Sequence, residues 1–165
     1  MKILNNLSDV SKNPKAVTVG NFDGIHKGHQ ALINKTKEIS AKSNVESLIF
    51  TFNKLPKEIF SPDTIQRLYD NKIKESILRS YKIDTLLSID FNEIKDYSAD
   101  FFCEEVLIKK LNAQYLIIGE NFKFGKDRSG DIEKLRKYDS KKAFELMVPK
   151  LETHDGVKIS SSRIR

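Results

Sequence analysis

Short apolar runs alternate with stretches of helical periodicity along almost the whole chain, and this alternation limits the folds open to it. Five strands are predicted from short, mainly apolar runs, at 16–20, 46–52, 84–89, 114–119 and 144–148, and the run at 114–119 has no alternation of polar and apolar residues. Four helices are predicted between them from the three- and four-residue spacing of apolar side chains, at 27–42, 68–81, 98–107 and 131–138. Helices between successive strands favour parallel pairing, and runs without polar alternation suit strands covered on both faces. We therefore predict one α/β domain over residues 1–165, with a Rossmann-like, doubly wound parallel sheet of about five strands.

The size and composition of the chain indicate a single globular domain without a membrane-spanning segment. The 165 residues suffice for one hydrophobic core, and no apolar run reaches the ~18 residues of a membrane span. The N-terminus lacks the apolar segment of a signal peptide, and Cys103 is the only cysteine, so we expect a cytoplasmic location. The net charge of +6 comes from scattered lysines without a block of five like charges, which indicates a solvated surface. We expect neither nucleic acid nor membrane as a partner.

The residues after the first predicted strand have the composition of a phosphate-binding turn. The segment reads Gly20-Asn21-Phe22-Asp23-Gly24-Ile25-His26-Lys27-Gly28-His29. If the helix begins near Lys27, His26 and His29 lie three residues apart on one face of its first turn. Gly28 between them leaves room for a ligand near free backbone N–H groups and the positive end of the helix dipole. The pattern predicts an anion site built from backbone amides and two imidazoles.

Other interpretations of this segment stay open on sequence alone. A metal site is the weaker alternative, because two histidines at this spacing have no third ligand that the pattern identifies. Asp23 is also suited to cap the following helix instead of contacting a nucleotide. Neither a Walker A loop nor a Gly-x-Gly-x-x-Gly turn occurs, so the phosphate site is of a different type. A second segment, Glu120 to Gly130, follows the fourth strand at the same expected edge of the sheet.

Four elements in order resemble those of one enzyme family. His-x-Gly-His after a first strand resembles the signature of the nucleotidylyltransferase superfamily. The longer segment from Gly20 to His29 resembles the prokaryotic bifunctional FAD synthetases (riboflavin kinase/FMN adenylyltransferase), in their N-terminal FMN adenylyltransferase domain. Three further elements resemble that family's Phe-Glu-Pro-His-Pro, Gly-x-(Asp/Asn)-Phe-x-Phe-Gly and Ile-Ser-Ser-Thr-x-x-Arg motifs: Thr51-Phe52 with Pro56 and Phe60, Gly119 to Gly125, and Ile159 to Arg165. Asn53-Lys54-Leu55 departs from the first of these motifs, and Ser162 replaces the threonine of the last.

The resemblance implies transfer of AMP from ATP to FMN, giving FAD and pyrophosphate, with Mg²⁺ held through the ATP phosphates and no direct protein ligands. It implies catalytic roles for His26, His29 and Arg165. It implies ATP contacts from residues of the first and last motifs: Gly20, Asn21, Phe22, Asp23, Gly24, His26, Gly28, His29, Ser161, Ser162 and Arg165. It implies FMN contacts from Pro56, Phe60, Asn121 and Phe124. Because Phe122 and Phe124 alternate along the chain, we expect their rings to face opposite ways.

The resemblance also leaves alternative functions and a question of domain content to consider. Family members continue into a riboflavin kinase domain, which we expect to be absent from this chain. Glycerol-phosphate cytidylyltransferases share Gly-x-Phe-Asp and His-x-Gly-His, so another nucleotidylyltransferase with a different phosphorylated acceptor is one alternative. A non-catalytic flavin- or nucleotide-binding module is another. The loop that contains Asn121 and Phe124 favours a flavin acceptor, since it resembles the flavin enzymes.

Overall fold

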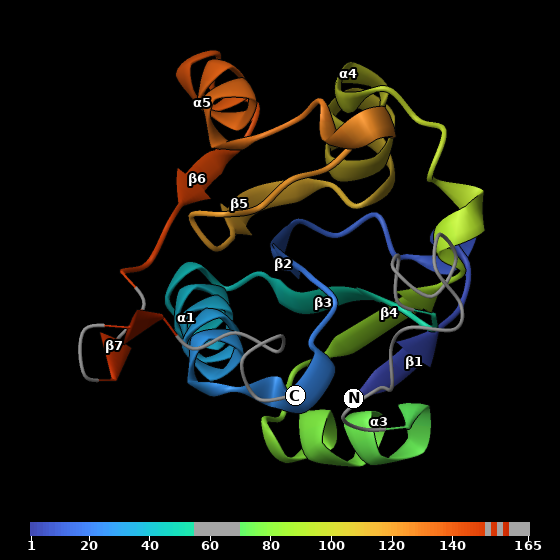
Figure 1. Ribbon diagram of the computed structural model, residues 1–165, viewed down its shortest axis with the longest axis vertical. Coiled ribbons are helices and arrows are strands. Elements are labelled where there is room, and N and C mark those ends of the chain that lie inside the picture. The colour runs from blue at the N-terminus through green and yellow to red at the C-terminus, as the bar shows by residue number, and fades with distance from the viewer. Residues whose placement is uncertain (55–69, 151–152, 155–156, 159–165) are drawn as a thin grey trace.

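A six-stranded, all-parallel sheet forms the centre of the molecule (Figure 1). The computed structural model describes residues 1–54, 70–150, 153–154 and 157–158. The sheet has the order β1-β4-β3-β2-β5-β6 and contains β1 (Lys2–Leu4), β2 (Lys15–Val19), β3 (Glu46–Phe52), β4 (Thr85–Ile89), β5 (Ala113–Ile117) and β6 (Glu145–Met147). A separate antiparallel pair joins β7 (Thr153–His154) to β8 (Val157–Lys158). The predicted α/β class and parallel pairing are confirmed.

Helices cover both faces of this sheet. They are α1 (Lys27–Ser43), α3 (Asn71–Ser80), α4 (Ala99–Phe101), which continues as the wider η4 (Phe102–Lys110), and α5 (Ile132–Ser140). Short turns of 3₁₀ helix are η1 (Leu7–Asp9), η2 (Asp23–Ile25), η3 (Phe91–Glu93) and η5 (Lys126–Arg128). Ser98 caps α4 as predicted, because its side chain accepts a hydrogen bond from the N–H of Phe101. Among the described residues, no helix is both long and apolar enough to cross a membrane.

Alternating side chains of the central strands supply hydrophobic clusters on both faces of the sheet. On β3, Leu48 and Phe50 join the larger cluster, which also contains Phe102 and Leu107 of η4. The intervening Ile49 joins a second cluster on the opposite face, together with residues of η2, α1 and α3: Phe22, Ile25, Ile33 and Leu78. Figure 1 shows the matching layers, with α1 and α3 on one side of the sheet and α4 and α5 on the other. The sheet is therefore doubly wound, as predicted.

The sixth strand is a correction to the predicted count of about five. β1 is only three residues long, and Lys2 and Asn5 flank its apolar pair Ile3-Leu4. Such a short run falls below the length at which an apolar pattern predicts a strand. The strand exists because it pairs with β4 from Lys2 opposite Thr85 to Leu4 opposite Leu87, and so extends the sheet edge.

The strand order places a topological switch point beside β2. From β2 the chain moves to β3 and then β4, and it returns to the other side of β2 as β5. Loops after β2 and β5 therefore leave the sheet in opposite directions at its carboxyl edge, which is where open parallel sheets bind their ligands. The two segments that sequence singled out, Gly20 to His29 and Glu120 to Gly130, follow these two strands.

Candidate functional site

The turn after β2 is anchored in the core by Phe22. Its ring is fully buried and packs in the cluster that contains Ile25, while its backbone has the left-handed φ of 49°. Gly20 stands against this ring, because a Cβ there would lie 3.2 Å from Cε2 of Phe22. The neighbouring Asn21 is exposed, and its carbonyl accepts a hydrogen bond of 3.1 Å from Oγ1 of Thr51 on β3. The buried ring of Phe22 and the hydrogen bond from Thr51 thus hold the backbone of the predicted ATP-contacting turn in place.

His26 and His29 form a stacked pair at the start of α1. Their ring centroids are 3.7 Å apart with an angle of 19° between the planes, which confirms that they share one face of the first turn. His26 is the N-cap of the helix, since its Nδ1 accepts a hydrogen bond of 3.3 Å from the N–H of His29. The interpretation of Asp23 as the cap is therefore wrong. The side chain of Asp23 is instead buried, and its charge acts on His26.

Burial keeps both imidazoles neutral in the free protein. Desolvation lowers the pKa of His26, and the nearby carboxylate of Asp23 offsets part of this effect. The pKa of His29 is lowered to about 3, with burial as the largest cause and the positive charges that His26 and Lys74 carry when protonated as smaller ones. Because Nδ1 of His26 accepts a hydrogen bond, neutral His26 carries its proton on Nε2, which is left to donate. Backbone N–H groups and neutral ring donors, rather than imidazolium charge, are thus the groups that the predicted anion site offers.

Lys74 belongs to this site, although sequence analysis did not select it. It lies on α3 with only 6% of its surface exposed. Its Nζ donates to the carbonyl oxygen of Phe52 at 2.9 Å and to Oγ1 of Thr51 at 3.3 Å, at the carboxyl end of β3. A signal was available, because Lys74 stands four residues before Leu78 and so within the apolar stripe of the predicted helix.

The loop after β5 folds back on itself around Phe124. Backbone hydrogen bonds of 3.1 and 2.8 Å join Phe124 and Gly130 in both directions. The ring of Phe124 is buried against Phe102, while Asn121 is exposed at the start of the loop. The rings of Phe122 and Phe124 lie 5.5 Å apart and stacked at 18°, so the expectation that they face opposite ways is wrong. Alternation requires an extended strand, whereas this segment turns, with a hydrogen bond from Phe122 N–H to the Gly119 carbonyl.

Several expected site residues fall in other parts of the chain. Pro56 and Phe60 of the expected flavin site, and Ser161, Ser162 and Arg165 of the expected second phosphate clamp, lie outside the described residues. Within the described part of the chain, no group of three or more His, Cys, Asp or Glu side chains could hold a metal ion. The structure thus brings together the turn after β2, the histidine pair and Lys74, and it places the Asn121 loop beyond the neighbouring strand β5.

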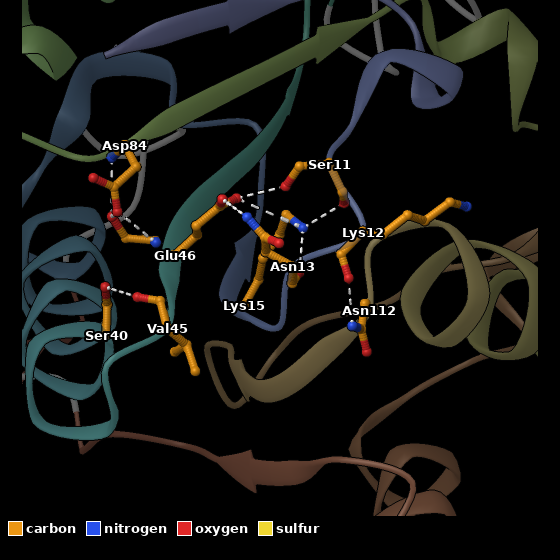
Figure 2. A network of polar contacts seen from close by, with 10 residues as sticks. Ser11, Lys12, Asn13, Lys15, Ser40, Val45, Glu46, Asp84 and Asn112 are labelled. Carbon is orange, nitrogen blue, oxygen red and sulfur yellow. Dashed lines mark hydrogen bonds and ion pairs between the residues drawn. The ribbon is translucent and has the colours of Figure 1, made fainter.

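A second buried lysine lies at the opposite edge of the sheet (Figure 2). Nζ of Lys15, at the start of β2, donates to the carbonyl oxygens of Ser11 and Asn13 at 2.6 and 2.5 Å. It also lies 3.8 Å from the carboxylate of Glu46, which accepts hydrogen bonds from the Ser11 and Asn13 side chains. Burial lowers the pKa of Lys15, and Glu46 opposes that effect. This network ties the loop before β2 to the start of β3 and is far from the carboxyl edge in the strand direction.

Comparisons with known proteins agree with this geometry. The sequence matches the family of FAD synthetases over residues 8–163. The bifunctional riboflavin kinase/FMN adenylyltransferase of Buchnera aphidicola subsp. Schizaphis graminum is 37% identical over 168 residues, which cover 98% of this chain and 53% of the relative. The chain spans about half the length of the curated relatives it matches.

Two solved structures share the fold. A protein described as a macrolide-efflux protein from Streptococcus pneumoniae superposes with a TM-score of 0.80 at 30% identity, over 99% of this chain and 55% of that chain. Pantothenate synthetase from Thermus thermophilus superposes with a TM-score of 0.60 at 15% identity, over 99% of this chain and 67% of that chain, which is a likeness of fold alone. With its family match over residues 8–163, and with the turn and histidine pair in place at the switch point, this chain belongs to the FAD synthetase family.

Proposed function

We propose that residues 1–165 form an FMN adenylyltransferase domain, which transfers AMP from ATP to FMN to give FAD and pyrophosphate. The observation that carries the proposal is the stacked pair His26–His29 at the start of α1, beside the β2–β5 switch point, in a chain of the FAD synthetase family. The Asn121 loop leaves the sheet on the other side of this point. A nucleotide on one side and a flavin on the other would meet at the carboxyl edge of the sheet between the two loops.

The reaction needs positioning and charge stabilisation more than a protein nucleophile. An oxygen of the FMN phosphate attacks the α-phosphorus of ATP, a new P–O bond forms, and the bond to pyrophosphate breaks as pyrophosphate leaves with the electron pair. Nε2–H of His26 and free N–H groups in the first turn of α1 donate to the phosphate oxygens that gain charge. His29 lies under His26 and against the ring of Phe22, at a centroid distance of 5.1 Å, which holds the pair in place.

Other groups complete the proposed site by family resemblance. Ser161, Ser162 and Arg165 would bind the β- and γ-phosphates, for which the planar fork of arginine is suited. Mg²⁺ bound to the triphosphate would neutralise part of its charge. Among the described side chains, the buried Asp23 is the one carboxylate that acts on the histidine pair. A single carboxylate does not make a protein cage for Mg²⁺, so the site fits an ion held mainly by the phosphates of the nucleotide.

The flavin side of the proposal rests on the loop after β5. Asn121 is exposed and offers an amide to the ring system, while the buried Phe124 holds the loop from within. Pro56 and Phe60 would add apolar surface against the flat isoalloxazine ring, as binding of such a ring requires. We propose ATP and FMN as the only substrates of residues 1–165, in the cytoplasm, without a role for nucleic acid or membrane. Phosphorylation of riboflavin belongs by name to the bifunctional relatives, and we do not assign it to these residues.

The test is the formation of FAD from ATP, FMN and Mg²⁺, followed by chromatography of the flavins. His26→Ala should lower kcat by about 10²-fold, because it removes one donor to the developing charge. Lys37→Ala, an exposed position further along α1, is the matched control and should leave the rate unchanged. Absence of FAD above the His26→Ala background contradicts the proposal.

The alternatives have their own outcomes in the same experiment. Formation of CDP-glycerol from CTP and glycerol 3-phosphate, with no FAD, would assign the site to a different phosphorylated acceptor. Flavin binding without any turnover would identify a binding module.

A further inference from the structure

Lys74 reaches the histidine turn from a neighbouring helix on the same face of the sheet. It projects from α3, which follows β3 in the chain, and its ammonium group lies over the carboxyl end of that strand. There it donates to the carbonyl oxygen of Phe52 and to the hydroxyl oxygen of Thr51. Burying a charged ammonium group costs free energy unless it is hydrogen-bonded. Lys74 is only 6% exposed, so these hydrogen bonds offset the cost of its burial.

The contact continues to the turn itself. Because Oγ1 of Thr51 accepts from Lys74, its own proton is free to point at the carbonyl oxygen of Asn21, 3.1 Å away. The hydrogen bonds therefore run in one direction, from ammonium to hydroxyl to carbonyl, and an ionised donor strengthens such a chain. Asn21 begins the turn that carries His26 and His29 toward the ligand.

We propose that Lys74 is a positioning residue for the phosphate site, acting through Thr51 on the Asn21 carbonyl and so on the turn before His26 and His29. The inference rests on the proposed function only in taking this turn as the ATP site. Electrostatics supports the proposal independently. Burial is the largest cause of the lowered pKa of His29, His26 is the second, and the charge of Lys74 is the third. The lysine thus fixes the turn and favours the neutral imidazole in the absence of nucleotide.

Lys15 supplies a matched control for the effects of burying a lysine. Both lysines are almost fully buried and both donate to backbone carbonyl oxygens, but Lys15 lies at the amino edge of the sheet. Lys74→Met and Lys15→Met remove the same charge and keep a side chain of similar length. Each should lower the urea midpoint, whereas only the change at Lys74 should affect the site.

The experiment measures the kcat/KM for ATP and the NMR titration of His29 in the full chain with Lys74→Met, Lys15→Met and Thr51→Val. The kcat/KM for ATP in FAD synthesis should fall about 10- to 100-fold in Lys74→Met and in Thr51→Val, mostly in kcat, because the turn shifts relative to the reacting phosphate. The NMR titration of His29 should move to higher pH in Lys74→Met and stay in place in Thr51→Val, which keeps the charge. Lys15→Met should match the wild type in both readouts.

Two results overturn the inference. One is a Lys74→Met protein that differs from the wild type no more than Lys15→Met does in catalysis and in His29 titration. The other, which decides the matter if Lys74→Met fails to fold, is a Thr51→Val protein with wild-type kcat. If the wild type makes no FAD, the proposed function fails separately, and the affinity for Mg-ATP by calorimetry with the His29 titration still tests Lys74.

Discussion

Mild acid should destabilise this protein, and the contribution of His29 to this effect follows from its folded and unfolded pKa values. The pKa of His29 is about 3 in the folded protein, with burial as the largest cause, against the ordinary histidine value of 6.5. Well above pH 6.5 the imidazole is neutral in both states, so it adds no pH dependence there. Between pH 6.5 and pH 3 the unfolded chain binds a proton that the folded protein excludes, so the free energy of unfolding falls as the pH falls.

The expected size of this effect at pH 5 is about 2 kcal/mol relative to pH 7. It follows from the excess protonation of the unfolded histidine over two pH units. Because pH 5 lies well above the folded value, a change of one unit in the folded pKa alters the result little. The half-buried position of His29 makes this figure an upper estimate.

Urea unfolding followed by far-UV circular dichroism at pH 7 and pH 5 measures the effect, since the chain has no tryptophan to report by fluorescence. His29→Asn supplies the comparison, because its amide does not titrate and is close in size to the imidazole. Carboxylates that lie away from His29 titrate alike in both proteins, so their contributions cancel in the difference. The fall in unfolding free energy between pH 7 and pH 5 should be about 2 kcal/mol smaller in His29→Asn. Equal falls in the two proteins would refute the reasoning, because His29 would then be as basic folded as unfolded.

Two further predictions concern the two loops. Gly125→Ala should lower the unfolding free energy by about 2 kcal/mol, because φ is +73° and the new Cβ would stand 2.8 Å from the backbone nitrogen of Ala99. Urea unfolding measures this change, and a stability equal to that of the wild type contradicts the tight packing of the loop on α4. Mg-ATP should raise the pKa of His29, since phosphate charge favours the imidazolium form. NMR titration of the ring with and without Mg-ATP checks this, and an unchanged pKa argues against phosphate contact at the histidine pair.

The sequence predicted those features that depend on local pattern. Apolar runs such as 46–52 marked the strands, because strands covered by helices on both faces need apolar side chains on both. The spacing of His26 and His29 placed both rings on one face, because the helical repeat fixes that relation without reference to the rest of the chain. Ser98 was predicted as a cap for the same reason.

The features that sequence analysis missed depend on contacts between distant segments. β1 is a strand only because β4 offers it an open edge. His26 replaces Asp23 as the cap because the buried ring of Phe22 fixes the turn before it, and so sets where the helix begins. Lys74 stood in an apolar stripe, but only the structure brings α3 over the end of β3, where Thr51 and Phe52 accept its hydrogen bonds.

The position of β5 beside β2 has a consequence for the order in which the protein can assemble. Val17 pairs with Leu116 and Thr18 with Ile117, so one side of the switch point comes from the first part of the chain and the other from its last third. Contacts so distant in sequence carry a high entropic cost of loop closure and slow folding. During synthesis the histidine turn can pack on β3 and α3 well before β5 has left the ribosome. A nascent chain would therefore carry an ordered histidine turn without the other side of the switch point, and nucleotide binding would gain its full strength only when the last third of the chain docks.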